Sequence, residues 1–413
     1  MKNPNVELLS PAGDLECLRF ALAYGADAVY LGSKEFGMRS SSTNFSYQEM
    51  QTATAEAHAL GKKVYLTLNT LPTNQEIARI PETIGKAAEA GIDAFIVADL
   101  GILSLVKQHA PGVEIHLSTQ AGITNYAAAR VAHQLGASRV VLARELSLTD
   151  IAEIRANIPP ELELEVFVHG AMCMSVSGRC LISQYLTGRD ANRGQCPQSC
   201  RWKYTLHEEH RPGEAFEIGE GEGGSYILSA DDLCTAPILD KIVAAGANSL
   251  KIEGRSKSFY YVASATAAYR AALNAVLQNP TGYVCPPFVQ QELTRTSHRP
   301  YSTGFFMGPQ GATQSANQAG YIRQWQVIGV VQGQQGGKAT LTQRGKFTLG
   351  EELEALLPEG RTITFTPAAI WDAKGAEIQS TPHAKMEFSV PVPAGETLPT
   401  NTILRRKIVQ EQT

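Results

Sequence analysis

Four cysteines in one short stretch of the chain are the residues with the clearest capacity for chemistry. They are Cys173, Cys180, Cys196 and Cys200, spaced Cys-x6-Cys-x15-Cys-x3-Cys, and a fifth, Cys234, follows later. A cysteine that serves as a small core residue belongs to an apolar pattern, whereas this stretch is rich in Gly, Arg, Asn and Gln. We therefore interpret these cysteines as metal ligands.

Ligand type narrows the choice of metal. The chain has seven cysteines, an odd number, and it opens without the charged and apolar segments that direct export. Reduced thiols in the cytoplasm are therefore expected. Thiolate sites hold structural zinc or an iron–sulfur cluster, and zinc sites usually contain two short Cys pairs. Only Cys196 and Cys200 form such a pair, so the spacing favours a cluster and leaves zinc open.

The cysteine stretch is also basic, although the whole chain is not. The formal net charge of the chain is -4, which gives no general attraction to nucleic acid. From Cys173 to Tyr204 the only acid is Asp190, and the cations are Arg179, Arg189, Arg193, Arg201 and Lys203. These side chains could bind phosphates, or they could belong to an ordinary solvated loop.

Further polar residues follow short apolar runs that we expect to be strands. They are Asn69, Asp99, His116, Gln120, Arg144, Glu145, His169, Lys251, Glu253 and Arg255. His169 directly precedes the cysteine stretch and could transfer protons or support a ligand. Lys251 and Arg255 flank Glu253, and they could hold a carboxylate or phosphate or close an ion-pair network.

A hydrolase has little support from the residues themselves. Neither a Gly-x-Ser-x-Gly turn nor a His-Glu-x-x-His segment occurs in the sequence. Ser175 and Ser177 lie between cysteines, but no base is paired with either in the sequence.

The elements that must position these residues follow an α/β pattern of short apolar runs and longer amphipathic runs. The strand candidates are residues 7–13, 28–32, 63–69, 94–99, 114–118, 139–144, 164–169, 226–230 and 249–253. The runs are almost continuously apolar, as in a parallel sheet that is buried on both faces. We expect a TIM-barrel-like (β/α)8 domain over residues 1–280, with 226–230 peripheral. A doubly wound sheet is the alternative, and the absence of Gly-x-Gly-x-x-Gly after the first strand weakens it.

In either architecture the loops at the C-terminal ends of the strands carry the chemistry. The strand at 164–169 leads into the cysteine cluster (173–234), so we expect the cluster at the barrel mouth. Residues 281–319 are expected to form a linker, because the composition changes after Pro280. Residues 320–413 contain six strand-like runs bounded by Gly, Pro and Asp, which predict a small C-terminal β-barrel, closed or nearly closed.

The overall composition is typical of a soluble globular protein. Hydrophobic residues make up 43% of the chain and charged residues 18%. No apolar run approaches the length of a transmembrane helix, so no contact with a membrane is expected.

Several segments together resemble the collagenase-like peptidase family of unknown catalytic type. They include EVFVHGAMC at 165–173, SGRCLIS at 177–183, RDANRG at 189–194 and KIEGRSK at 251–257, and the resemblance covers nearly the whole chain. It implies hydroxylation at a 4Fe-4S centre, and in particular prephenate-dependent formation of 5-hydroxyuridine at wobble position 34 of tRNA. The word peptidase comes from older assignments, and no catalytic residues are carried over for it.

The resemblance also implies a set of iron ligands. Members of the family share cysteines at the positions of Cys173, Cys180 and Cys196. The fourth thiolate corresponds either to Cys200 or to Cys234, and this sequence has both.

The leading hypothesis is therefore a tRNA uridine hydroxylase with its cluster at the barrel mouth. We expect catalytic roles for His169, Glu253 and Arg144. Substrate binding is expected from Arg179, Arg189, Arg193, Arg201, Lys251 and Arg255, with Arg144, Lys251 and Arg255 holding a small dicarboxylate such as prephenate. The expected partners are a tRNA anticodon loop with its target base flipped out and a second family member. A collagenase-like peptidase and a non-catalytic tRNA-binding accessory subunit are the alternatives.

Overall fold

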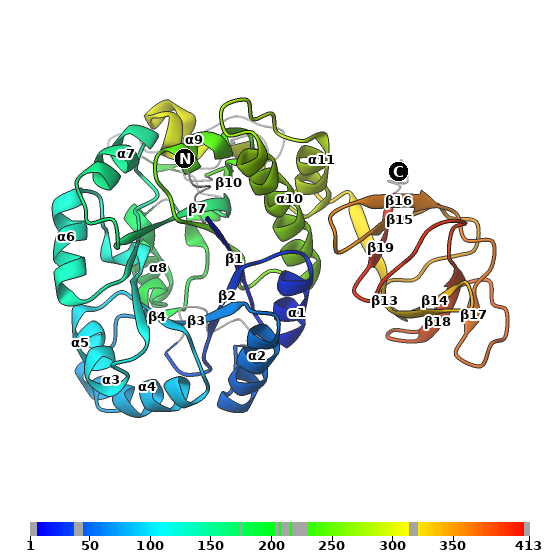
Figure 1. The fold of residues 1–413 in the computed structure, drawn as a ribbon, viewed down its shortest axis with the longest axis horizontal. Coiled ribbons are helices and arrows are strands. Elements are labelled where there is room, and N and C mark those ends of the chain that lie inside the picture. The colour runs from blue at the N-terminus through cyan, green and yellow to red at the C-terminus, as the bar shows by residue number, and fades with distance from the viewer. Residues whose placement is uncertain are drawn as a thin grey trace.

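The computed structural model describes residues 6–36, 44–173, 175–202, 206–207, 215–216, 230–313 and 321–408. Within these residues a barrel of parallel strands and outer helices is followed by an antiparallel β domain (Figure 1). The β domain lies beside α10 and α11 of the barrel unit.

Eight parallel strands form the wall of the barrel. They are β1 (Glu7–Pro11), β2 (Ala28–Gly32), β3 (Lys63–Leu68), β4 (Ala94–Val97), β5 (Glu114–Leu117), β6 (Arg139–Val141), β7 (Glu163–Gly170) and β11 (Ser249–Ile252). Consecutive strands pair in parallel, and β11 pairs with both β7 and β1, which closes the sheet. The predicted (β/α)8 barrel is confirmed. Of the ninth candidate, 226–230, only Ala230 is among the described residues.

A ring of helices covers the outside of the barrel (Figure 1). The helices are α1 (Leu15–Ala23), α2 (Tyr47–Ala59), α3 (Asn74–Ile77), α4 (Ile80–Glu89), α5 (Leu100–His109), α6 (Tyr126–Leu135), α7 (Leu148–Ala156), α9 (Leu239–Ala244) and α10 (Phe259–Gln278). Residues close to each helix start determine where the helix begins. Ser46 and Ser147, for example, form capping boxes with Glu49 and Asp150, which satisfy free backbone N–H groups at the start of α2 and α7.

Where the structure describes it, the chain between β7 and β11 is mostly short turns. It contains η2 (Val176–Gly178), α8 (Ile182–Thr187), η3 (Ala191–Arg193), η4 (Ser199–Arg201), β8 (Leu206–His207), β9 (Ala215–Phe216), β10 (Asp232–Cys234) and η5 (Ala236–Ile238). β10 pairs antiparallel with the end of β7, so that Cys234 lies opposite His169. The cysteine-rich turns therefore leave the barrel at β7 and return to the same strand.

The segment expected to be a linker packs on the barrel where it is described. It contains α11 (Pro287–Arg295) and β12 (Tyr301–Ser302), and β12 pairs with β10. Val289, Leu293 and Phe306 are buried in the same apolar cluster as the barrel strands.

The C-terminal domain is one curled antiparallel sheet. Its strands are β13 (Trp325–Gln335), β14 (Lys338–Gln343), β15 (Leu353–Leu356), β16 (Thr362–Phe365), β17 (Trp371–Asp372), β18 (Glu387–Pro391) and β19 (Ile403–Lys407), in the order β16-β15-β19-β13-β14-β18-β17. Its core includes Ile328, Leu341 and Phe388. In the described part of the chain no pairing joins β16 to β17, so hydrogen bonds do not close the predicted barrel.

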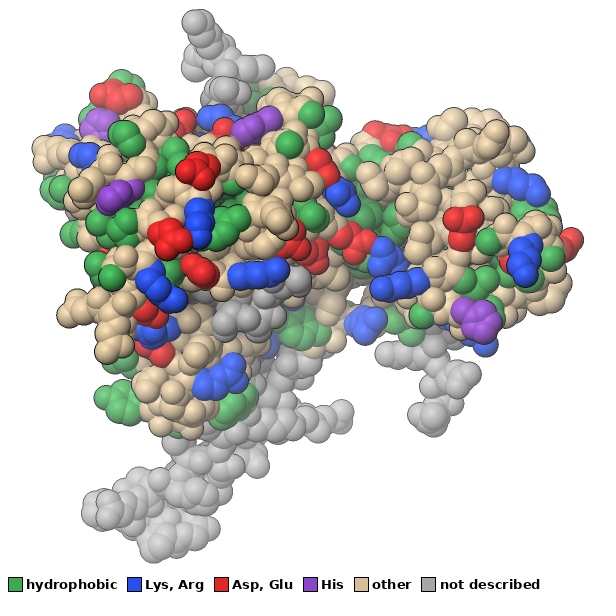
Figure 2. Space-filling view, turned by 90° about the horizontal axis from the view of Figure 1, so that it is seen from below, with side chains coloured by type: hydrophobic (Ala, Val, Ile, Leu, Met, Phe, Trp, Pro, Cys, Tyr) green, Lys and Arg blue, Asp and Glu red, His purple; other side chains and the backbone are tan. Residues whose placement is uncertain are grey.

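A buried interface joins the two units. Phe20, Tyr24 and Tyr260 of the barrel helices pack against Leu356 and Ile403 of the β domain. Figure 2 shows a larger and a smaller lobe, with Lys, Arg, Asp and Glu side chains gathered along the seam between them.

Candidate functional site

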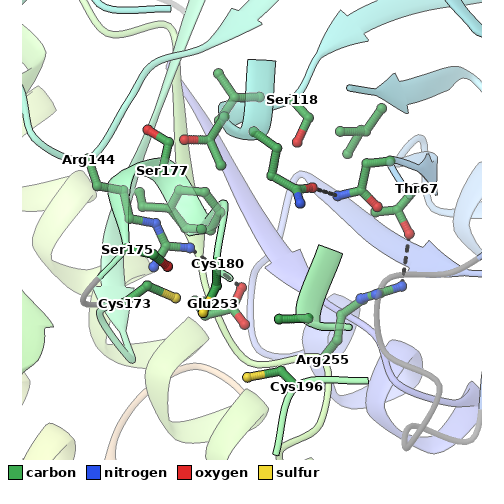
Figure 3. A pocket seen from close by; sticks show the side chains of 18 of the residues that line it. Thr67, Ser118, Arg144, Cys173, Ser175, Ser177, Cys180, Cys196, Glu253 and Arg255 are labelled. Carbon is green, nitrogen blue, oxygen red and sulfur yellow. Dashed lines mark hydrogen bonds and ion pairs between the residues drawn. The ribbon is translucent and has the colours of Figure 1, made fainter. Parts of the chain in front are cut away.

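A pocket opens at the C-terminal ends of the barrel strands (Figure 3). Its cavity volume is about 160 Å³. The polar and charged side chains that line it from the barrel are Thr67, Asn69, Ser118, Thr119, Gln120, Arg144, Lys251, Glu253 and Arg255. The turns that follow β7 complete the wall. The site is thus where the sequence predicted it, at the barrel mouth.

Four of the five candidate cysteine ligands line this pocket. They are Cys173, Cys180, Cys196 and Cys200, and Figure 3 shows the thiols of the first three turned into the space that Glu253 also borders. None of the chain's cysteines forms a disulfide. As placed, no three His, Cys, Asp or Glu side chains among the described residues are close enough together to hold a metal ion. The donors fit a thiolate-bound cluster in type and number, but the turns must draw together to bind one.

Side-chain hydrogen bonds attach these turns to the barrel and to one another. Glu145 accepts hydrogen bonds from the backbone N–H of Ser177 at 2.7 Å and from its hydroxyl at 2.9 Å. Asn192 accepts from the Cys180 N–H at 3.1 Å and donates to the Cys180 carbonyl at 2.9 Å. Because irregular backbone needs such partners when it is partly buried, these contacts determine where the cysteines lie.

Cys234 lies apart from the other candidate ligands. It does not line the pocket, and its position opposite His169 on β10 places its thiol 3.9 Å from the Tyr269 hydroxyl. Burial raises the pKa of this thiol to about 11.

His169, predicted as a catalytic residue, does not line the pocket either. It is buried among the rings of Tyr261, Tyr269 and Tyr301, at centroid distances of 5.9, 5.3 and 5.5 Å. The register between β7 and β11 shifts by one residue, so that His169 pairs with Ile252. Such a bulge reverses the alternation of side chains along a strand. Burial lowers the pKa of His169 to about 3, and this geometry gives His169 no access to a substrate in the pocket.

Arg144 and Glu253 do line the pocket. The Arg144 guanidinium lies 4.0 Å from the Glu253 carboxylate, 3.8 Å above the centre of the Phe167 ring, and 2.8 Å from the Ala171 carbonyl. The Tyr30 hydroxyl donates to the Ile252 carbonyl at 2.9 Å and lies 3.4 Å from the Glu253 carboxylate. The two charges therefore partly neutralise each other at the edge of the cavity.

A column of charged side chains inside the barrel supports Lys251. The Lys251 ammonium donates to Glu165 at 2.7 Å, Glu165 also pairs with Arg139 at 3.1 Å, and Arg139 reaches Glu7 at 2.6 Å. Burial alone would raise the pKa of Glu165, but the charges of Lys251 and Arg139 lower it to about 2. Glu165 therefore stays ionised and holds Lys251 at the pocket floor.

Arg255 approaches the pocket from the next turn along the barrel. Its guanidinium donates a hydrogen bond to the Thr67 hydroxyl at 2.8 Å. Arg144, Lys251 and Arg255 thus all line one cavity. Lys251 also belongs to an ion-pair network, which is the second of the two roles expected for it.

Three arginines of the cysteine stretch, Arg179, Arg189 and Arg193, lie outside the pocket lining. Arg193 pairs with Glu76 at 2.6 Å, and Arg179 donates to the Gln120 carbonyl at 2.5 Å. Arg179 and Arg189 are exposed at the surface. The side chain of Arg201 lies outside the described part of the structure.

Sequence reasoning missed the pocket residues that lie within the strands. Tyr30, Thr67 and Phe167 all line the cavity, but each lies in a run that is apolar on both sides of it. The available signal was the alternation of inward and outward side chains along each strand.

The remaining polar residues at strand ends have structural roles. Asp99 caps α5 by accepting from the Ile102 N–H at 3.0 Å. His116 is buried in the barrel beside Glu114, at 3.2 Å.

Among the described residues no helix is both long and apolar enough to cross a membrane.

The fold and the pocket define a TIM-barrel protein of the enzyme type, with a thiol-rich loop over the carboxyl ends of its strands. The chain belongs to peptidase family U32. The family matches residues 13–316, and the peptidase family U32 C-terminal domain matches residues 323–405.

Three relatives show the range of names within this family. tRNA hydroxylation protein P of Escherichia coli is 36% identical, with 94% of each chain covered. The 23S rRNA 5-hydroxycytidine synthase of the same species is 39% identical over 66% of this chain and 40% of its own. A collagenase of Porphyromonas gingivalis is 33% identical over 73% of each chain.

Proposed function

We propose that this chain is an RNA hydroxylase that forms 5-hydroxyuridine at wobble position 34 of tRNA. The observation that carries the proposal is that four thiols and three cations line one pocket at the barrel mouth. The similarity to tRNA hydroxylation protein P extends over nearly the whole of both chains, and it supports tRNA as the substrate.

We infer further that the pocket thiols hold a 4Fe-4S cluster. A cluster bound there supplies one-electron redox chemistry. Cys173, Cys180 and Cys196 are three of its ligands in this proposal. Cys200 is favoured as the fourth because it lines the same pocket, whereas Cys234 lies on β10 beside Tyr269.

The cations suit a small dicarboxylate co-substrate, for which we propose prephenate. Arg144 and Arg255 can each hold a carboxylate by two parallel hydrogen bonds, and Lys251 adds a point charge between them. Glu253 competes with such a ligand for Arg144, so binding of the co-substrate would release this carboxylate into the pocket. A flipped uracil would then enter the same pocket beside the thiols.

The cluster is tested by variants of single cysteines in anaerobically purified protein. Cys180→Ser is expected to lose iron and the brown colour of the cluster, and Cys285→Ser, outside the pocket, is the matched control. Cys200→Ser should lose iron and Cys234→Ser should keep it. The reverse outcome for this last pair would show that β10 moves toward the pocket when the cluster binds.

The activity is tested by mass spectrometry of tRNA from a deletion strain that carries each variant. We expect no 5-hydroxyuridine at the wobble position with Cys180→Ser, and normal modification with Cys285→Ser. Normal modification with Cys180→Ser would contradict the proposal.

The collagenase relative makes a peptidase the second candidate. Ser175 and Ser177 line the pocket, but no histidine is among its described lining residues. Ser177 donates instead to the Glu145 carboxylate at 2.9 Å. Cleavage of gelatin by the colourless, iron-free protein, abolished by Ser177→Ala, would favour this candidate. Hydroxylation that appears only with a second family member would point to an accessory role.

A further inference from the structure

The short helix α8 exposes apolar side chains and buries a polar one, which is the reverse of the usual pattern. Ser183 is 1% exposed and donates a hydrogen bond toward the Cys180 sulfur at 3.9 Å. In contrast, Tyr185 is 85% exposed and Leu186 is 51% exposed. Such exposure has a cost in water, so it indicates a surface that binds something.

Exposed apolar side chains are concentrated around this helix. Of the fourteen large hydrophobic residues that are exposed in the described chain, six come from residues 176–202: Val176, Leu181, Ile182, Tyr185, Leu186 and Trp202. η4, which immediately precedes Trp202, packs against α8. We call Leu181, Tyr185, Leu186 and Trp202 the α8 surface.

The α8 surface continues into the pocket. Ile182, on the same helix, lines the cavity together with Cys180. A partner bound to α8 would therefore lie next to the proposed reaction site.

Charge distinguishes among the possible partners. Residues 173–202 contain four arginines and a single acid, Asp190. Arg193 is paired with Glu76, whereas Arg189, two residues after the end of α8, is exposed. Aromatic side chains beside arginines are how proteins hold unpaired bases and their phosphates. A neutral apolar partner would gain nothing from these cations.

We propose that the α8 surface stacks unpaired bases of the substrate RNA loop, with Tyr185 and Trp202 as the stacking rings and Arg189 on the phosphates. This inference rests on the proposed function for its substrate. It adds a docking surface outside the pocket. This surface would position the target nucleotide close to the cysteines.

Substitutions at Tyr185 separate stacking from simple apolar contact. The probe is an unmodified anticodon stem-loop RNA that binds the full-length protein, measured by fluorescence anisotropy. Tyr185→Phe should bind as wild type does. Tyr185→Leu keeps an apolar side chain without a ring face, and it should bind roughly tenfold or more weakly. Tyr126→Leu on α6, where the exposed fraction is 37%, is the matched control and should have no effect.

Trp202 offers a direct optical test. In a Trp325→Phe, Trp371→Phe background, Trp202 is the remaining tryptophan of the chain. Addition of the stem-loop should quench its fluorescence because bases that stack on indole quench it. Addition of a fully paired RNA hairpin stem should not, because its bases are already stacked.

Two results would overturn the inference. One is equal affinity of wild type and Tyr185→Leu for the stem-loop, which would leave an apolar surface for a protein or a lipid. The other is equal quenching by paired and unpaired RNA. Neither measurement depends on turnover, so failed hydroxylation with intact stacking would count against the proposed function alone.

Discussion

At the level of single residues, the pocket depends on charges that are buried far from water. Lys251 is 4% exposed and contacts Glu165, which is fully buried. A buried ion pair adds little net stability, but removal of one partner is strongly destabilising because the other charge is left unpaired. Glu165 is therefore a positioning residue, which acts on the site through Lys251.

Glu165→Gln should lower the free energy of unfolding by about 3 kcal/mol. The amide cannot neutralise Lys251 and Arg139, and both remain buried. Urea unfolding followed by circular dichroism measures the change. Glu161→Gln, at a side chain that is 63% exposed, is the control and should change stability little. An equal loss of stability in both variants would show that the buried column of Lys251, Glu165 and Arg139 has no special role in stability.

His169 should make the protein less stable in mild acid. Burial lowers its pKa in the folded protein to about 3, and electrostatic interaction with the nearby His298 and Lys257 acts in the same direction. In the unfolded chain the pKa is about 6.5, so below that pH the unfolded state binds a proton that the folded state does not. Stability is therefore complete above about pH 6.5 and falls by up to about 1.4 kcal/mol per pH unit below it.

Replacement of His169 tests whether this residue causes the loss of stability in mild acid. His169→Phe should flatten the decline in unfolding free energy between pH 6.5 and pH 5, and the remaining decline would include the buried His116, whose pKa is also lowered by burial. The exposed His383→Gln should leave the wild-type slope intact. An unchanged slope in His169→Phe would show that its ring can be protonated in the folded state.

At the level of elements, the carboxyl ends of neighbouring strands fit one another so closely that single atoms matter. A Cβ atom on Gly32, at the end of β2, would lie 1.9 Å from the Arg255 guanidinium and 2.9 Å from the Asn44 side chain. The absence of a side chain at this position is what lets Arg255 reach Thr67 and the pocket.

Gly32→Ala should displace Arg255 while the barrel stays folded, because the atom it meets is the end of a flexible side chain. We expect prephenate, measured by calorimetry, to bind about tenfold more weakly, which corresponds to one charged hydrogen bond. Gly85→Ala on α4, where an added Cβ meets nothing within 4 Å, is the matched control. Unchanged affinity in Gly32→Ala would remove Arg255 from the binding site.

At the level of the whole molecule, a fully buried arginine links the β domain to the barrel. Arg405 of β19 makes two hydrogen bonds of 2.6 Å to Glu292 of α11, and it also contacts Glu354 at 2.5 Å and the Tyr260 hydroxyl at 3.1 Å. Arg295 pairs with Glu354 at 2.7 Å. The two units are therefore joined by directional bonds as well as by apolar packing.

Arg405→Leu should lower the free energy of unfolding by about 3 kcal/mol or more, because Glu292 loses its bidentate partner in a dry interface. It should also make the protein more susceptible to limited proteolysis. The double variant Glu292→Met, Arg405→Leu should recover part of the loss, since Glu354 keeps Arg295. Arg361→Leu removes only surface ion pairs and should change stability little. If the double variant is no more stable than Arg405→Leu, the loss of stability comes from packing and not from the unpaired Glu292.

The barrel, the place of the cysteine loop and the three pocket cations could be predicted from the amino-acid sequence. Apolar runs, caps and turn residues are local, and parallel strands bring their carboxyl ends to one edge wherever they close. Lys251, Arg255 and Arg144 could therefore be assigned to the pocket from their positions after strands.

The direction of His169, the place of Cys234 and the exposure of α8 could not be predicted and became clear from the folded chain. A shift of one residue between β7 and β11 turned His169 outward, and the pairing of β10 with β7 carried Cys234 away from the other thiols. Both depend on contacts between residues distant in the chain, which no local pattern records. The exposure of Tyr185 likewise follows from what packs beneath α8, because a helix pattern shows which residues share a face but not which face is covered.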